Sequence, residues 1–131
     1  NFQGSLYCNR IALKQIITNV ISNSIKYNKE AGSISIKSSI DNGWINLEIS
    51  DNGHGIAKEK LNNIFRPFNK SRKLAIINQE GAGLGLPLTK SLLDTHDGTI
   101  NINSNRGKGT TVIISLPLIS ENANYRPRKL A

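Results

Sequence analysis

The sequence predicts an α/β fold, a two-layer sandwich in which a mixed, mostly antiparallel sheet of about five strands is covered on one face by about three helices. Two long segments carry apolar residues at the three-and-four spacing of an amphipathic helix. Two pairs of shorter segments alternate apolar and polar residues, as half-buried strands do. The order helix, hairpin, short helix, long aperiodic segment, helix, hairpin is typical of helices packed on one side of a sheet. A chain of 131 residues is long enough for one such domain and too short for two.

The first helix is predicted from about Arg10 to Tyr27, with Asn9 as its N-cap. Two strands follow, at 33–40 and 44–50. The tripeptide Asp41-Asn42-Gly43 between them predicts a tight hairpin turn, because Asn and Gly tolerate positive φ.

The second half begins with a short helical segment at 58–65. Residues 66–83 lack helix or strand periodicity, and a loop of that length in a compact domain is typical of a functional lid. A second long helix is predicted at 84–98, with Pro87 in its first turn and Gly98 at its end. Strands at 99–104 and 110–117, joined by a glycine-rich turn, complete the fold.

Composition narrows the function classes. The net charge of +8 suggests nucleic acid as a possible partner. The positive residues are scattered along the chain, however, and they cluster only at 69–73 and 126–129. One Cys and two His cannot form a disulfide or a closed zinc site within the chain, so a reducing, cytoplasmic location is expected. No apolar run approaches the length of a membrane span. We expect residues 1–5 to be a remnant of a cloning protease site, 6–118 to form the domain and 119–131 to be a tail.

Two groups of residues suggest phosphate chemistry. Asn19, Asn23 and Lys26 share one helical face, where amide oxygens can complete the coordination of Mg²⁺ and the lysine can neutralise phosphate; an ordinary solvent-facing stripe is the alternative. Three glycines at the entry of the second helix expose backbone N–H groups to which phosphate binds, although such entries also occur where helix and sheet pack closely. The preceding segment supplies the cations of a closing lid. These glycines and cations are Gly81, Gly83, Gly85, Lys70, Arg72 and Lys73.

Five motifs in order carry a family resemblance: "NVISNSIKYN", "DNGHG", "IFRPF", "GAGLGL" and "GKGTT". Over residues 6–117 the chain resembles the catalytic ATP-binding domain of bacterial sensor histidine kinases, in the superfamily shared with gyrase, heat-shock chaperones and mismatch-repair ATPases. The resemblance implies the Bergerat fold, with a long ATP lid, and Mg-ATP as ligand.

The resemblance also implies roles for individual residues. Asn23 would coordinate Mg²⁺ with help from Asn19, while Lys26 and Tyr27 would contact the phosphates or the sugar. Asp51 would accept a hydrogen bond from the adenine amino group, with support from Thr110, and Gly53 and Gly55 would let the backbone approach the base. Phe65 and Phe68 would anchor the lid. The remaining implied nucleotide-binding residues are Ile56, Lys70, Arg72, Lys73, Gly81, Gly83, Leu84, Gly85 and Leu86.

The chemistry expected is phosphoryl transfer and not hydrolysis. Hydrolysing members of the superfamily carry a glutamate where this chain has Asn19, so a general base for water is missing. The family pattern then implies transfer to a histidine of a separate dimerisation domain in a homodimeric parent, and onward to a response regulator. No nucleic acid and no direct membrane contact are expected, although the parent may be membrane-anchored or soluble. Arg66 and His54 depart from the family pattern and affect lid electrostatics and pocket shape.

Two other functions stay open at this point. A basic nucleic-acid-binding module would need aromatic side chains interleaved with the charges, and the one Trp, three Tyr and three Phe are not so placed. A degenerate family member would bind nucleotide only for regulation.

Overall fold

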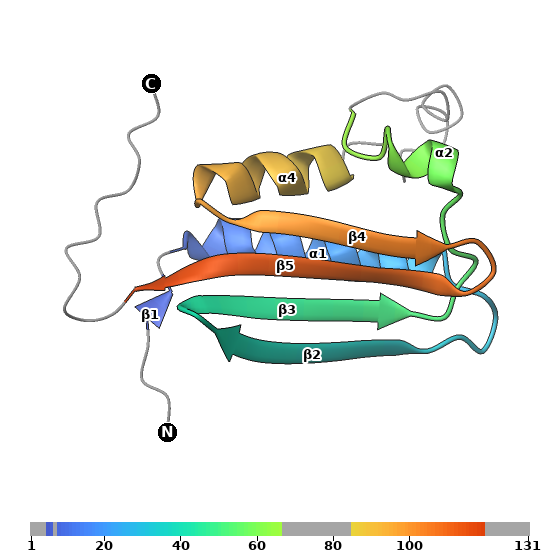
Figure 1. Ribbon diagram of the computed structural model, residues 1–131, viewed down its shortest axis with the longest axis horizontal. Coiled ribbons are helices and arrows are strands. Elements are labelled where there is room, and N and C mark those ends of the chain that lie inside the picture. Colours follow the sequence, from blue (N-terminus) through green and yellow to red (C-terminus); the bar gives the residue numbers. More distant parts are fainter. Residues whose placement is uncertain (1–4, 7, 67–84, 120–131) are drawn as a thin grey trace.

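The computed structural model describes residues 5–6, 8–66 and 85–119. Two layers are visible in Figure 1, a twisted sheet and a layer of helices on one of its faces. The elements in chain order are β1 (Ser5–Leu6), α1 (Arg10–Lys26), β2 (Ile34–Asp41), β3 (Trp44–Asp51), α2 (Lys58–Leu61), α4 (Gly85–Thr95), β4 (Thr99–Asn105) and β5 (Gly109–Ile119). The predicted two-layer α/β sandwich is confirmed.

The sheet is organised around β5, its longest strand. β5 pairs with β3 and β4, β2 pairs with β3, and β1 pairs with the last two residues of β5. Every one of these pairings is antiparallel in the part of the chain that the structure describes. The pairing of Ser5 with Ile119 places both residues in the sheet.

Alternation along the strands builds the core. Ile49 of β3 and Val112, Ile114 and Leu116 of β5 belong to the buried core, and the strand register places Ile49 directly opposite Val112. Against them pack Ile16 and Val20 of α1 and Leu93 of α4, all at most 1% exposed. Burial of each such side chain contributes about 1.5–3 kcal/mol to the free energy of unfolding. The apolar residues that recur at helical spacing in α1 and α4 and those that alternate along β3 and β5 therefore form a single hydrophobic core.

The ends of α1 follow local sequence signals. Asn9 is the N-cap, and its Oδ1 accepts hydrogen bonds from the backbone N–H groups of Ile11 and Ala12 at 2.9 and 3.2 Å. The helix ends at Lys26, with Tyr27 as C-cap, one residue before the predicted end. The N–H of Asn9 also donates to Nε2 of His96 at 3.2 Å, which joins the start of α1 to the chain just after α4.

The first hairpin has the predicted turn. Asp41 pairs with Trp44, and the two residues between them, Asn42 and Gly43, have φ of 47° and 81°. Positive φ at both positions matches the right-handed twist of the flanking strands. The predicted helix at 58–65, by contrast, continues only to Leu61.

The helices cover the sheet unevenly. α1 lies behind β4 and β5 in Figure 1, and no labelled helix lies over β2. Ile36 and Ile40 of β2 are accordingly 53% and 44% exposed.

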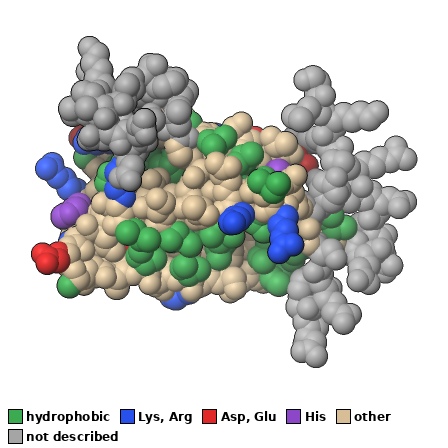
Figure 2. Space-filling model, turned by 180° about the vertical axis from the view of Figure 1, so that it is seen from behind, with side chains coloured by type: hydrophobic (Ala, Val, Ile, Leu, Met, Phe, Trp, Pro, Cys, Tyr) green, Lys and Arg blue, Asp and Glu red, His purple; other side chains and the backbone are tan. Residues whose placement is uncertain are grey.

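Figure 2 shows apolar side chains gathered in a band across the middle of the face seen from behind. No helix in the described ranges has both the length and the apolar composition needed to cross a bilayer.

Candidate functional site

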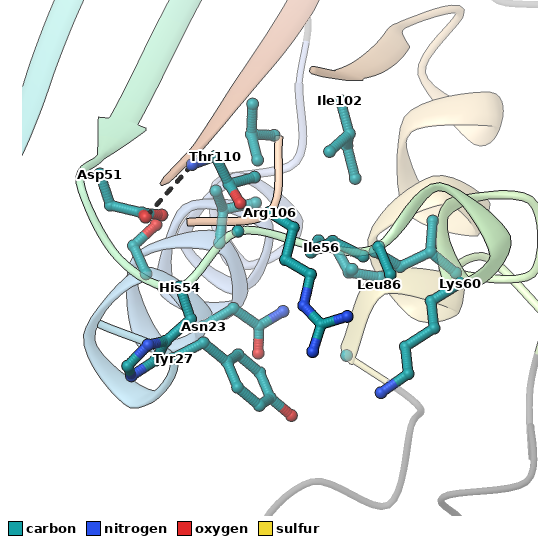
Figure 3. Close-up of a pocket in the computed structure, with 17 residues that line it drawn as sticks. Asn23, Tyr27, Asp51, His54, Ile56, Lys60, Leu86, Ile102, Arg106 and Thr110 are labelled. Atoms are coloured by element: carbon teal, nitrogen blue, oxygen red, sulfur yellow. Dashed lines mark hydrogen bonds between the residues drawn. The ribbon is translucent and has the colours of Figure 1, made fainter. Parts of the chain in front are cut away.

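A cavity of about 510 Å³ opens where β3 ends and β5 begins. Its walls come from the C-terminal half of α1, the loop after β3, α2, the start of α4 and the β4–β5 turn (Figure 3). The lining residues are Val20, Asn23, Ser24, Tyr27, Asp51, His54, Gly55, Ile56, Ala57, Lys60, Ile64, Gly85, Leu86, Ile102, Arg106, Thr110 and Val112. This volume lies within the range of small-molecule sites, and apolar walls with few polar groups are typical of them.

Asp51 is the only carboxylate among the cavity-lining residues that the structure describes, and it is held in one orientation. Its Oδ1 accepts hydrogen bonds from the backbone N–H of Gly53 at 2.9 Å and from that of Thr110 at 3.3 Å. Strand register fixes the second contact, because Asp51 and Thr110 are directly paired. Both bonds that the carboxylate accepts from described residues go to Oδ1, so Oδ2 is left to accept a hydrogen bond from a ligand.

Ser104, at the end of β4, connects three segments of the site. Its hydroxyl oxygen accepts a hydrogen bond from the N–H of Ile56 at 2.7 Å and donates to the carbonyl of Gly109 at 3.0 Å. The hydroxyl of Thr110 lies 2.8 Å from the same oxygen. A serine hydroxyl has one hydrogen, and Ser104 donates it to the carbonyl of Gly109. The hydroxyl of Thr110 is therefore the donor in its hydrogen bond with Ser104. The Thr110 oxygen then has a lone pair for a ligand or a water.

Two glycines allow the loop after β3 and the β4–β5 turn to touch. Gly55 has φ of +69°, and a Cβ there would collide with the carbonyl oxygen of Asn105. Gly109 has φ of +109°, and a Cβ there would collide with the carbonyl oxygen of Asp51. The N–H of Gly107 donates to the carbonyl of His54 at 2.7 Å. The glycines of "DNGHG" and "GKGTT" thus permit close backbone contact between the two motifs.

The polar face of α1 divides into two parts. Asn23 and Tyr27 line the cavity. Asn19 does not line it; its amide nitrogen donates to the carbonyl of Gly85 and to the hydroxyl of Thr89, both at 3.3 Å. Asn19 thereby fixes the start of α4 relative to α1, while its amide oxygen is not used in these bonds. Lys26 lies on the exposed surface, with its Nζ 5.3 Å from the centre of the Tyr27 ring.

Among the described residues that line the cavity, cationic groups outnumber acidic ones. Lys60 and Arg106 line it together with Asp51, so the formal charge of the lining residues is positive. Within the described ranges no three His, Cys, Asp or Glu side chains cluster as metal ligands. A metal at this site would therefore rely on amide oxygens, on water and on oxygens of the bound molecule, which is the ligand set that Mg²⁺ accepts.

Comparison with known proteins decides the family. Residues 8–120 match the family model described as histidine kinase-, DNA gyrase B-, and HSP90-like ATPase. The chain belongs to this family. The match covers the five motifs that carry the predicted resemblance, and the resemblance is confirmed.

The curated relatives compared with this family member are several times longer than the chain. The chain is 39% identical over 111 residues to the non-motile and phage-resistance protein of Caulobacter vibrioides, covering 82% of the chain and 13% of that protein. It is 32% identical over 123 residues to an uncharacterized sensor-like histidine kinase, R01002, of Rhizobium meliloti, covering 94% of the chain and 23% of that protein.

Solved structures agree with the sequence comparison. The mycobacterial sensor histidine kinase MprB superposes with a TM-score of 0.73 at 26% identity, over 88% of this chain and 76% of that one. Full-length ShkA in complex with AMPPNP superposes with a TM-score of 0.74 at 25% identity, over 95% of this chain and 25% of that one.

The structure gathers part of the predicted site of this family member. The predicted residues that line the cavity are Asn23, Tyr27, Asp51, Gly55, Ile56, Gly85, Leu86 and Thr110. Gly53 is buried beside it and donates to Asp51. The predicted lid residues Phe68, Lys70, Arg72 and Lys73 lie outside the described residues, as do Gly81, Gly83 and Leu84 of the predicted phosphate-binding entry to the second helix. Phe65, also assigned to the lid, is half-buried, 6.0 Å from Nζ of Lys90 on α4.

Several cavity residues were missed from the sequence. Lys60 and Arg106 line the cavity, and Ser104 accepts a hydrogen bond from the lining residue Ile56, but none of the three lies within one of the five motifs. His54, one of the two residues that depart from the family pattern, is exposed and lines the cavity. Ile102 and Val112 were predictable as core-facing strand positions, but not as walls of a cavity.

Proposed function

We propose that this chain binds Mg-ATP in the cavity and presents the γ-phosphoryl group to a histidine on a separate dimerisation domain. Within a longer sensor histidine kinase, the phosphoryl group would then pass to an aspartate of a response regulator. The observation that carries the proposal is the Asp51 carboxylate, which is held by Gly53 and Thr110 with Oδ2 available at one end of a nucleoside-sized cavity.

Asp51 suits an adenine base. A fixed carboxylate oxygen accepts the exocyclic amino hydrogen of adenine, and it has no donor to offer a base with a carbonyl at that position. Ile56, Ile102 and Val112 supply apolar wall against which the faces of a planar ring can pack. The AMPPNP bound to ShkA supports the assignment, because that structure and this one share a fold at a TM-score of 0.74.

The phosphate end would lie toward α1 and the start of α4. Asn23 is the amide of the α1 motif that lines the cavity, and we assign it as the Mg²⁺ ligand with its amide oxygen. Asn19 would assist mainly by holding Gly85 and Thr89 of α4 in place. The backbone N–H groups at the start of α4 favour negative charge, as do Lys26 and the cations of residues 67–84.

Transfer is favoured over hydrolysis. Asn19 occupies the position from which a carboxylate would activate water, and an amide cannot act as a general base. For phosphoryl transfer to a histidine of another domain, the protein mainly has to position the nucleotide and neutralise the charge of its phosphates. The residues of this site offer those two functions.

A calorimetric titration with AMPPNP, with and without Mg²⁺, tests the proposal. Saturable binding of one nucleotide per chain, strengthened by Mg²⁺, is the expected result. A parallel titration with a DNA duplex at two salt concentrations tests the rival function. Salt-sensitive DNA binding without nucleotide binding would overturn the proposal.

A further inference from the structure

Arg106 occupies a fixed place in the β4–β5 turn. The N–H of Gly107 donates to the carbonyl of His54 at 2.7 Å, and a Cβ on Gly55 would lie 3.0 Å from the Cα of Arg106. The backbone at Arg106 is therefore packed against the loop that follows Asp51. This placement depends on strand register and on the contact between the turn and the loop.

The Arg106 side chain extends over the cavity. It is one of the lining residues, and in Figure 3 its guanidinium lies on the side of Asn23 and Lys60, away from the Asp51 carboxylate. The base-binding end and the guanidinium thus lie at different parts of one cavity. A ligand with its base at Asp51 would extend its other end toward Arg106.

No carboxylate neutralises this guanidinium among the described residues. The salt bridge between residues of the described ranges joins Lys90 and Asp94, both on the outer face of α4. Asp51, the carboxylate of the cavity, accepts its hydrogen bonds from Gly53 and Thr110. Lys60 adds a second positive charge to the same wall. A planar guanidinium beside a cavity, without an acidic partner, is well suited to bidentate binding of phosphate oxygens.

We propose that Arg106 is a nucleotide-binding residue that contacts the phosphate chain of the bound nucleotide from the β4–β5 turn. This inference rests on the proposed binding of Mg-ATP. It adds a phosphate contact to those expected from α1, from the start of α4 and from the lid. This contact would come from a turn whose backbone is held by the sheet and by the loop after β3.

Paired titrations with Mg-ATP and with adenosine test the assignment, because adenosine has the base and sugar but no phosphate. Arg106→Ala should weaken Mg-ATP roughly 10- to 100-fold, the size expected for charged hydrogen bonds, and change adenosine affinity less than about twofold. Arg106→Lys, which keeps the charge and loses the fork, should fall between. Adenosine binding is followed by NMR chemical-shift titration, which tolerates weak affinity.

Lys108→Ala is the matched control. It removes one positive charge from the same turn. Arg106 and Lys108 are both exposed, but Lys108 does not line the cavity, so both affinities should stay within about twofold of the unaltered chain. An Arg106→Ala chain that binds Mg-ATP as the unaltered chain does would overturn the inference. So would equal losses for Mg-ATP and adenosine, which indicate a base contact or a damaged fold. Failure of the unaltered chain to bind either ligand would instead overturn the proposed function.

Discussion

The backbone N–H of Thr110 donates a hydrogen bond of 3.3 Å to Oδ1 of Asp51, and the two residues are directly paired where β3 ends and β5 begins. Fifty-nine residues separate the two in sequence. The contact orients the carboxylate before any ligand arrives, since Gly53 holds the same oxygen at 2.9 Å. Preorganised acceptors of this kind lose little entropy on binding.

Asp51→Asn should weaken nucleotide binding by about 2–4 kcal/mol, or roughly 30- to 1,000-fold. The amide can keep its oxygen toward Gly53 and Thr110, but an NH₂ group then replaces Oδ2 and meets the adenine amino group donor to donor. Calorimetry with AMPPNP measures the loss. Asp41→Asn is the control, because Asp41 has the same neighbours in sequence and lies exposed at the hairpin turn. Equal affinities for the two variants would contradict the role of Asp51.

Asn23→Ala should reduce the gain in affinity that Mg²⁺ provides. The amide oxygen of Asn23 is the proposed metal ligand in the cavity, and alanine has no donor atom for the ion. The measurement is the ratio of AMPPNP affinities with Mg²⁺ and with a chelator, which should fall roughly tenfold for the loss of one ligand contact. Ser22→Ala, on the exposed side of the same helix, should leave that ratio unchanged. A ratio unaffected by Asn23→Ala would remove Asn23 from the metal site.

Gly55→Ala should destabilise the chain more than Gly43→Ala does. Both glycines have positive φ, +69° and +81°, so alanine at either position incurs about 1–2 kcal/mol of backbone strain. A Cβ at Gly43 meets nothing within 4 Å, whereas one at Gly55 collides with the carbonyl of Asn105. Overpacking of that kind adds about 1–3 kcal/mol. Urea denaturation of the two variants gives the difference, and identical midpoints would show that the loop and the turn are not packed together.

Ser104→Ala should lower the free energy of unfolding by about 1–3 kcal/mol, because the half-buried N–H of Ile56 loses its acceptor. It should also weaken nucleotide binding modestly, since the Thr110 hydroxyl loses the partner that orients it. Thermal or urea unfolding, followed by titration of the folded variant, measures both effects. Ser38→Ala on the exposed face of β2 serves as control. Unchanged stability of the Ser104 variant would rule out the network as a structural element.

Incubation with γ-labelled ATP should leave this chain unlabelled. His54 and His96 are its two histidines. His54 lies beside the Asp51 end of the cavity, and His96 is joined to the N–H of Asn9 and the carbonyl of Leu92. Neither lies where the phosphate end is proposed to be. Acid-labile label accumulating on the chain, under conditions in which binding is verified, would contradict transfer to a separate acceptor domain.

Much of the fold was predictable because its signals are local. The Asn9 cap, the apolar spacing of α1 and the Asn42-Gly43 turn each depend on residues within a few positions of one another. The short helix after Gly55 was predicted too long, since the apolar residues Ile64 and Phe65 follow helical spacing without a helix in the structure. β1 was missed, because a two-residue strand has no period to detect.

By itself, the sequence determined the family, the order of helices and strands, and the residue types offered to a nucleotide, because motif spacing and side-chain period are properties of the chain. The tertiary structure alone decided which of two equivalent-looking amides faces the cavity. Asn23 lines it, and Asn19 is used to hold α4. It also brought Ser104 and Arg106 to the site, through backbone contacts between segments about fifty residues apart. Such contacts depend on strand register and loop packing, which are set only when the whole sheet has formed.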